Sequence, residues 1–299
     1  MPTIKTVLRN YSAKINSLDL EILLAKAINQ SREFVLTHSE RRLTTIQYLK
    51  LRSYISARAK LKPLAQIIKE KEFYNLKFIV NKHTLIPRPE TELLVEEVLQ
   101  KTNRLADKYS CADYCLLDIG TGSGNIIISL VKNIPFQKSN LSVDKFIAID
   151  ISGGALRVAK KNARRHKTEK RIVFLKGDLL KPFFKKYSKK SPPKNLIISA
   201  NLPYLSEKIY HNCDDSVKLF EPKTALYSRN NGLQHYENLL KQLQNPTIKQ
   251  KNIFLFLEIS PEQKNLIKKL IKEYFPQAKI IFKKDLSGKW RLCKITIKQ

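Results

Sequence analysis

Apolar and polar residues change their spacing along the chain near residue 73. Before it, two stretches place apolar residues three and four positions apart: SLDLEILLAKAI (17–28) and TTIQYLKLRSYISARAKL (44–61). This is the spacing of amphipathic helices, and no glycine interrupts the first 73 residues. We therefore expect residues 1–73 to form a small helical bundle.

The next segment, residues 74–90, alternates through short β-like runs and ends on two prolines that flank Arg88. Proline fixes its own φ and keeps the residue before it out of the helical region. We expect a β-hairpin linker here, followed by a rigid, extended turn.

From residue 91 to 299 the pattern alternates between strands and helices. Five β-rich runs are separated by helix-like segments: CLLDI, KFIAID, RIVFLK, NLIISA and NIFLFLEI. Strands separated by helices predict a parallel sheet with crossovers, and hence a doubly wound α/β domain. Only a short polar turn separates two further runs, AKIIFKKD and RLCKITIK, which predicts an antiparallel last pair.

Composition places the chain among globular proteins. It has 299 residues, 42% of them hydrophobic, which is enough to bury a full core. No stretch has the roughly 18 consecutive apolar residues of a membrane helix, and the N-terminus lacks the apolar centre of a secretory signal. Four cysteines, at positions 111, 115, 213 and 293, show neither zinc spacing nor disulfide density. We expect a cytoplasmic monomer with reduced thiols, no metal site and no membrane contact.

The charge is strongly positive, a formal +30 from 42 Lys and 14 Arg against 26 acidic residues. A surplus of this size attracts phosphate groups without regard to sequence. The positive residues are scattered or lie in surface-like runs such as KKYSKKSPPK (185–194), which favours solvated lysine over a binding stripe. Weak contact with RNA or the ribosome through this basic surface stays open.

Residues that could bind a ligand lie at the ends of three successive predicted strands. The first, CLLDI, carries Asp118 at its end and is followed by GTGSGN; the second ends in Asp150, and Asp178 follows the third. Ligands of such sheets bind beyond the carboxyl ends of the strands. The glycines allow a tight turn and close backbone approach, in a pattern that is neither the dinucleotide fingerprint nor a P-loop. The acids can accept hydrogen bonds from an amino group, two ribose hydroxyls and an adenine edge, which together describe S-adenosylmethionine.

The fourth predicted strand, NLIISA, ends in Asn201, Leu202, Pro203 and Tyr204. An amide nitrogen is a poor nucleophile because its lone pair is delocalised into the carbonyl group. Methyl transfer to it therefore requires that the lone pair point at the methyl carbon. The Asn201 side-chain oxygen and the Leu202 carbonyl, held by Pro203, can accept two hydrogen bonds from a substrate NH2 group. Tyr204 offers a ring face to a planar group. Taken alone, the segment could also be an ordinary Asn-Pro turn.

With these strand ends in place, the sequence resembles a known family. Asn-x-Pro-Tyr after the fourth strand, with DIGTGSG upstream, is similar to class I methyltransferases that act on nitrogen of planar groups. Three stretches are similar to the release factor glutamine methyltransferases, the HemK/PrmC family: PLAQIIKEKEFYNLKFIVNKHTLIPRPETELLVE (63–96), FEPKTALYS with NNGLQHY (220–236), and EISPEQ (258–263). The resemblance runs from the N-terminal helices to the closing strands.

The resemblance implies a Rossmann-like class I methyltransferase domain at 91–299, with a mostly parallel seven-stranded sheet and an antiparallel last strand. It implies transfer of a methyl group from S-adenosylmethionine to the side-chain nitrogen of the glutamine in the Gly-Gly-Gln motif of peptide-chain release factors. Residues 1–73 would help to dock the release factor. Residues expected to bind the cofactor are Asp118, Gly120, Thr121, Gly122, Ser123, Gly124, Asp150, Asp178, Leu179 and Asn201. Asn201, Leu202, Pro203 and Tyr204 are expected to bind the glutamine, with Asn201, Pro203 and Tyr204 as the catalytic set.

One position departs from the family pattern. The family usually reads Asn-Pro-Pro-Tyr, whereas Leu202 stands in place of the first proline. Asn-Leu-Pro-Tyr is also common in rRNA adenine dimethyltransferases, and the charge of +30 would suit them. An rRNA or DNA adenine-N6 methyltransferase is therefore the alternative, and a catalytically inactive RNA-binding relative is a third interpretation. Against the alternative, the rRNA enzymes lack the IPRPETE segment and carry their catalytic domain at the N-terminus.

Overall fold

The computed structural model describes residues 1–106, 114–134, 145–189, 192–248 and 251–298. The chain forms two compact units. The first comprises Met1–Glu70 and Asp214–Phe220, and the second comprises Lys71–Cys213 and Glu221–Gln299. Within the described ranges, no helix combines the length and the apolar character needed to cross a membrane.

The first unit is a set of short helices around one apolar core, as expected from the helical spacing. Its helices are α1 (Ile4–Tyr11), α2 (Ser17–Ile28), α3 (Arg32–Thr37), α4 (Thr45–Ala59), α5 (Leu64–Ile68) and α11 (Asp215–Phe220). The first four begin after a capping side chain that accepts a backbone N–H of the first turn: Thr3, Asn16, Ser31 and Thr44. Leu20, Leu23 and Leu51 are fully buried between them. The end of α11 is fixed by the Gln66 side chain, which donates to the Phe220 carbonyl at 2.9 Å.

A two-stranded hairpin follows, with strands β1 (Glu70–Phe73) and β2 (Leu76–Ile79). Its two-residue turn is Tyr74-Asn75, and both residues have positive φ, 49° and 58°. That conformation matches the twist of the flanking strands. The turn is held from outside, because Oε1 of Glu92 accepts the Tyr74 N–H at 2.9 Å.

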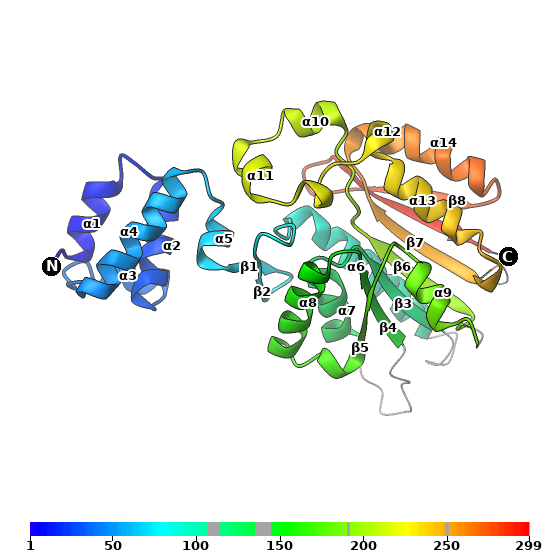
Figure 1. Ribbon diagram of the computed structural model, residues 1–299, viewed down its shortest axis with the longest axis horizontal. Coiled ribbons are helices and arrows are strands. Elements are labelled where there is room, and N and C mark those ends of the chain that lie inside the picture. Colours follow the sequence, from blue (N-terminus) through cyan, green and yellow to red (C-terminus); the bar gives the residue numbers. More distant parts are fainter. Residues whose placement is uncertain (107–113, 135–144, 190–191, 249–250, 299) are drawn as a thin grey trace. The chain divides into compact units, whose positions relative to one another are not determined.

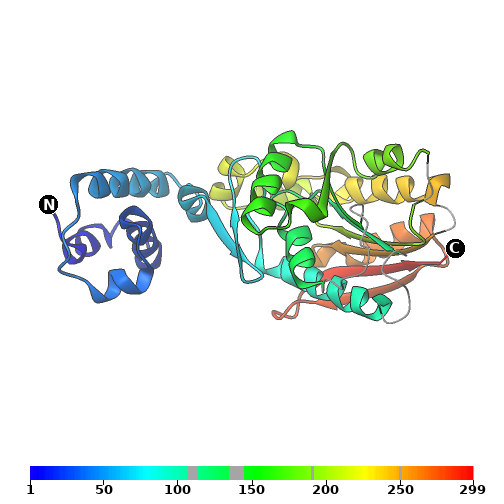
Figure 2. The same cartoon turned by 90° about the horizontal axis from the view of Figure 1, so that it is seen from below.

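Seven strands form the main sheet of the second unit (Figures 1 and 2). They are β3 (Tyr114–Ile119), β4 (Phe146–Asp150), β5 (Ile172–Lys176), β6 (Asn195–Ala200), β7 (Asn252–Glu258), β8 (Lys279–Lys284) and β9 (Trp290–Ile297). Their order is β5-β4-β3-β6-β7-β9-β8, with β9 antiparallel to both of its neighbours and the first five strands parallel. The predicted mostly parallel sheet with an antiparallel last strand is confirmed.

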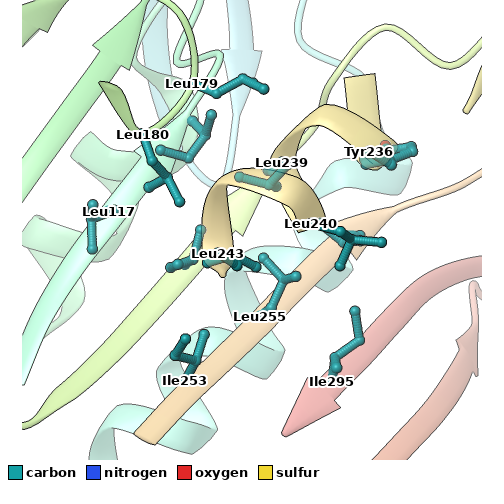
Figure 3. Close-up of a cluster of buried hydrophobic side chains, with 14 of the residues drawn as sticks. Leu117, Leu179, Leu180, Tyr236, Leu239, Leu240, Leu243, Ile253, Leu255 and Ile295 are labelled. Carbon is teal, nitrogen blue, oxygen red and sulfur yellow. The ribbon is translucent and has the colours of Figure 1, made fainter. Parts of the chain in front are cut away.

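Helices cover both faces of this sheet. On one face lie α6 (Glu92–Ala106), α7 (Asn125–Asn133) and α8 (Gly153–Arg165), packed on Leu116 and Ile197. On the other lie α9 (Lys181–Lys186), α13 (Gln234–Leu243) and α14 (Lys264–Tyr274), packed on Leu117 and Leu255. Figure 3 shows the second layer, where Leu239, Leu240 and Leu243 of α13 point at the strands. Successive residues of one strand thus serve opposite layers, as the pleat requires.

Shorter helices connect these layers. They are α10 (Glu207–His211), α12 (Arg229–Gly232) and the 3-10 turns η1 (Pro89–Thr91), η4 (Glu169–Arg171), η5 (Lys223–Ala225), η6 (Pro246–Ile248) and η7 (Pro261–Gln263). Three of the 3-10 turns begin with proline, whose fixed φ suits the first position of a helical turn.

The buried side chain of Asn162 joins the hairpin to the main domain. Its Oδ1 accepts the Ile79 N–H at 2.7 Å, and its Nδ2 donates to the Ile79 carbonyl at 3.0 Å and to the Ser123 carbonyl at 2.8 Å. Asn162 therefore pairs with Ile79 much as a neighbouring strand would. The same amide connects β2 to the loop after β3.

Replacing Asn162 with alanine should lower the free energy of unfolding by about 3 kcal/mol, because three backbone groups, one of them in a buried hydrogen bond and two in part-buried ones, lose their partner at roughly 1–3 kcal/mol each. Denaturant unfolding followed by circular dichroism measures this. Asn133→Ala is the matched control, since that exposed residue makes a single bond to the Ser129 carbonyl. If both variants were equally stable, Asn162 would not be what fixes the hairpin.

Candidate active site

The carboxyl ends of β5, β4, β3 and β6 open into one cavity of the second unit. Its volume is about 270 Å³, and Ile119, Asp150, Gly177 and Asn201 line it from the four strand ends. The chain passes from β3 to β4 and β5 on one side and then returns to β6 on the other side of β3. Such a reversal of strand order leaves the crevice in which open α/β sheets bind ligands.

The glycine-rich loop after β3 forms one wall. The N–H groups of Gly120 and Thr121 both donate to the Ile149 carbonyl, at 2.9 and 3.0 Å, so the loop is attached to β4. Gly124 has φ +80°, and a Cβ added there would lie 3.2 Å from the Cβ of Ala159 in α8. A larger residue at this position would be strained and would push α8 away from the loop.

Asp118 lies fully buried beneath this loop. Its Oδ2 accepts from the Thr121 hydroxyl at 2.6 Å, and its Oδ1 accepts from the Ser199 hydroxyl at 3.0 Å. Burial raises the pKa of Asp118 to about 7, the two hydroxyls oppose this rise, and Asp150 adds to it. The carboxyl group therefore supports the loop from behind the cavity wall.

Asp150, at the end of β4, lies on the wall itself. Its Oδ1 accepts the Ser152 N–H and its Oδ2 accepts the Gly122 N–H, each at 2.8 Å. Burial raises the pKa of Asp150, and the two N–H groups oppose that rise. Because a carboxylate oxygen can accept two hydrogen bonds, each oxygen keeps capacity for a ligand hydroxyl.

The loop after β5 contributes Asp178 and Leu179. Asp178 is paired with Lys181 at 2.9 Å, and its side chain is 42% exposed. Leu179 is buried and has φ +49°, a left-handed conformation that costs a leucine on the order of 1 kcal/mol. His235 of α13 lines the same cavity, and burial lowers the pKa of its ring.

The segment Asn201–Tyr204 leaves β6 at the mouth of the cavity. The Nδ2 of Asn201 donates to Oγ1 of Thr91 at 3.2 Å, which leaves Oδ1 of Asn201 for the cavity. The Leu202 side chain is buried, and its Cδ2 would lie 3.0 Å from a Cβ added to Gly120. The backbone of Leu202, and not its side chain, is therefore the part available to a ligand.

The end of β7 supports this segment from behind. The Tyr204 hydroxyl donates to Oε1 of Glu258 at 3.2 Å. Burial raises the pKa of both groups, to about 7 for Glu258 and far above its usual value for Tyr204. The Tyr236 hydroxyl donates to the Glu258 carbonyl and is hydrogen-bonded to the backbone of Leu202.

Gln263, in η7, holds the main chain of the same segment. Its Nε2 donates to the Tyr204 carbonyl at 3.0 Å and to the Asn231 carbonyl at 3.2 Å. Its Oε1 accepts the Ser260 N–H at 3.1 Å. Residues 258–263 thus hold both the side chain and the main chain of Tyr204.

An ion pair joins two further segments of the wall. Nη2 of Arg88 contacts Oε1 of Glu221 at 2.5 Å, and the Ile86 N–H donates to Oε2 of Glu221 at 2.9 Å. The Glu221 carboxylate is almost fully buried. Because a buried carboxylate that loses its partner is costly, this ion pair holds residues 86–88 against Glu221.

The structure brings most of the predicted site residues together. The cavity is lined by Gly120, Thr121, Gly122, Ser123, Asp150, Asp178, Leu179, Asn201, Leu202 and Pro203. Asp118, Gly124 and Tyr204 are not among its lining residues; Asp118 and Tyr204 support it through hydrogen bonds, and Gly124 allows close packing. Contact of any of these residues with a ligand stays a prediction.

Several lining residues received no role from the sequence. Arg88 and Thr91 lie in IPRPETE, a stretch that carried the family resemblance, and His235 lies in a second such stretch. Ile151 follows the strand-end acid Asp150 and is 67% exposed. An apolar residue directly after a strand-end carboxylate was a usable signal for Ile151, since a ligand can cover it.

No group of three or more His, Cys, Asp or Glu side chains that could hold a metal ion occurs in the part of the chain that the structure describes. Cys293 is a free thiol, and Cys115 is buried. Cys111 lies outside the described residues.

Comparisons with known proteins identify relatives of both the N-terminal helices and the α/β domain. Residues 4–68 match the PrmC N-terminal domain, and residues 112–222 match a methyltransferase domain. A release factor glutamine methyltransferase of Enterococcus faecalis is 39% identical over 230 residues, which cover 77% of this chain and 74% of that protein. One from Bacillus anthracis is 32% identical over 91% of this chain and 89% of its own length.

A solved structure, the release-factor-specific protein-(glutamine-N5) methyltransferase of Alicyclobacillus acidocaldarius, aligns with 74% of this chain and 100% of that chain. Its identity of 19% and TM-score of 0.40 are too low to support a conclusion. The sequence relatives suffice, because each is more than 30% identical and is matched over more than two thirds of its length. The chain belongs to the release factor glutamine methyltransferase family.

Proposed function

We propose that this protein transfers a methyl group from S-adenosylmethionine to the side-chain amide nitrogen of the glutamine in the Gly-Gly-Gln motif of peptide-chain release factors. The observation that carries the proposal is the orientation of Asn201. Its Nδ2 is engaged by Thr91 at 3.2 Å, so its acceptor oxygen is left for a substrate NH2 group at the cavity. The names of the family relatives support the same reaction.

The residues around the cavity fit the cofactor. A Cβ added to Gly122 would have only the Gly120 carbonyl within 4 Å, at 3.9 Å, so the loop leaves room for a ligand against its backbone. Asp150 can accept two ribose hydroxyls, and Ile151 and Leu179 offer apolar surface to an adenine ring. When bound, S-adenosylmethionine supplies an activated methyl group on a positively charged sulfur.

The protein's own residues then position the amide. Oδ1 of Asn201 and the Leu202 carbonyl accept the two N–H bonds of the substrate glutamine, so the nitrogen lone pair is directed along the line of attack. Pro203 fixes the direction of the Leu202 carbonyl through its ring. When the nitrogen gains the methyl group, the methyl–sulfur bond would break and leave S-adenosylhomocysteine, and the nitrogen loses one proton to solvent. Two fixed acceptors hold the N–H groups until then.

We further propose that residues 1–73 dock the release factor, that residues 74–90 link them to the methyltransferase domain at 91–299, and that the protein acts in the cytoplasm as a monomer. The match of residues 4–68 to the PrmC N-terminal domain supports a dedicated substrate module. Any contact with the ribosome through the basic surface would add to this docking.

Incubation of the purified protein with labelled S-adenosylmethionine tests the proposal directly. Label should appear in the glutamine of an intact release factor and not in ribosomal RNA. Label in adenine of the RNA would favour the alternative that Leu202 raises, an adenine-N6 methyltransferase. Label in neither would favour an inactive, RNA-binding relative.

Asp150→Ala should weaken S-adenosylmethionine binding about a hundredfold or more, because two charge-assisted hydrogen bonds to the ribose, each worth about 1.5–3 kcal/mol, are lost. Titration calorimetry measures the affinity, and the melting temperature shows whether the loop that Gly122 anchors stays folded. Unchanged affinity would mean that Asp150 does not contact the ribose.

Asn201→Ala should slow methyl transfer by about 10² to 10³, the scale for removing one oriented polar group from an active site. Leu202→Pro should stay within about tenfold of the wild type, since the carbonyl keeps its place. It should also melt at a lower temperature, because the buried Leu202 side chain and its backbone bond to Tyr236 are lost. Single-turnover methylation of a release factor at saturating cofactor separates the two variants. Equal rates for Asn201→Ala and the wild type would reduce the segment to a structural turn.

A further inference from the structure

Glu258 lies behind the Asn201–Tyr204 segment, and the reaction as described gives it no role. Its side chain is buried at the end of β7. Oε1 accepts from the Tyr204 hydroxyl at 3.2 Å, whereas Oε2 has no hydrogen-bond partner among the residues that the structure describes. A buried carboxylate oxygen without a donor is unfavourable, so a nearby donor should engage it.

The Thr91 hydroxyl can be that donor. Thr91 is 1% exposed, and its Oγ1 accepts from Nδ2 of Asn201 at 3.2 Å. A hydroxyl also carries one proton, and among the described hydrogen bonds the Thr91 proton has no acceptor. The same hydroxyl stabilises the ionised form of Glu258. The carboxylate is therefore the natural acceptor for the Thr91 proton.

This arrangement decides which way the Asn201 amide faces. An ionised Glu258 can only accept, so the Thr91 proton points to it and Oγ1 of Thr91 is left to accept from Nδ2 of Asn201. The Asn201 oxygen then meets the substrate NH2 group. If Thr91 donated to Asn201 instead, the Asn201 oxygen would have to face Thr91. The Asn201 NH2 group would then face the substrate NH2 group, and two donors cannot form a hydrogen bond with each other.

We propose that Glu258 is a positioning residue for methyl transfer, which acts through the Thr91 hydroxyl to hold the Asn201 oxygen toward the substrate glutamine. The proposal rests on the proposed function. Tyr204 contributes by donating to Oε1, which keeps the carboxylate in place beside Thr91. The two stretches IPRPETE and EISPEQ thereby act on one side chain, that of Asn201.

The relay should respond to pH. Burial raises the pKa of Glu258 to about 7; Thr91, Tyr204 and Arg291 of β9 oppose this rise, and Glu90 of η1 adds to it. A protonated Glu258 can donate to Thr91 and so release the Thr91 proton toward Asn201. Methyl transfer should therefore slow as the pH falls through about 7.

Single-turnover methylation of a release factor at saturating cofactor, from about pH 5.5 to pH 9, tests the relay. At pH 8, Glu258→Gln should lower the rate about tenfold or more and should lose the inflection near pH 7. The KM for the release factor and the affinity for S-adenosylhomocysteine should change less than about threefold, since Glu258 does not line the cavity.

Thr91 variants test whether the two residues act in series. Thr91→Val keeps the shape without the hydroxyl and should match the rate loss of Glu258→Gln, whereas Thr91→Ser should restore most of the wild-type rate. The double variant Thr91→Val/Glu258→Gln should be no slower than either single variant. Rate losses that multiply in the double variant would overturn the relay.

Two controls separate the relay from general effects. Glu97→Gln alters a comparably buried carboxylate, paired with Lys283 and Lys294 outside the cavity, and should leave the rate within about threefold. Burial also raises the pKa of Asp118 to about 7. Asp118→Asn should therefore keep the inflection if it belongs to Glu258, and an inflection that survives Glu258→Gln would overturn the assignment.

The side-chain amide signals of Asn201 in a ¹⁵N–¹H spectrum give a readout that needs no substrate; they are identified by their loss in Asn201→Asp. They should shift near pH 7 in the wild type and stay constant in Glu258→Gln. If the shift is seen but release factor is not methylated, the proposed function fails and the relay stands. If the Asn201 signals still shift near pH 7 in Glu258→Gln, the relay fails. It also fails if the loss of methylation rate in this variant is matched by an equal loss of cofactor affinity and a lower melting temperature.

Discussion

The hydrogen bonds between the end of β7 and the segment after β6 are the contact on which the site depends. β6 and β7 are neighbours, with Ala200 opposite Leu257, so the residues beyond both ends meet across one strand spacing. Glu258, Tyr236 and Gln263 engage the side chain or main chain of residues 202–204. A chain that leaves a strand would otherwise be free to move, and acceptors for a substrate amide must be fixed within a fraction of an ångström to be useful.

Two buried carboxyl groups, those of Asp118 and Glu258, hold parts of the site in place through hydrogen bonds. Asp118 and Glu258 are both almost fully buried, and the pKa of each is raised to about 7 by burial. Since folding raises both values above those of the unfolded chain, their protonated forms are favoured by folding, and stability declines as the pH rises from about 4 toward 7. Hydroxyl donors beside each acid, Thr121, Ser199 and Tyr204, limit this loss. The two buried acids therefore lower the stability of the folded protein at neutral pH, while they hold the residues of the site in a fixed orientation.

The sequence located the site because a parallel sheet brings the carboxyl ends of its strands to one edge, so Asp150, Asp178 and Asn201 meet whatever the details of packing. It could not tell that Asp118 points beneath the loop while Asp150 faces the cavity. Beneath the loop, Asp118 is bound by Ser199, which stands opposite it in the β3–β6 register and comes from a distant part of the chain. Nor could spacing reveal Thr91 beside Asn201, since 110 residues separate them and only the folded chain joins them.

The place of β9 in the sheet bears on how the protein is made. β9 is the last strand in chain order among the described residues, yet it lies between β7 and β8 and not at an edge. Until the ribosome has released it, β7 presents an open edge of nearly continuous buried residues, Ile253–Glu258, which is a template for wrong pairing. β7 therefore gains its second neighbour only after β9 has been synthesised. A nascent chain can already contain every residue that lines the cavity and still lack the strand that pairs with β7.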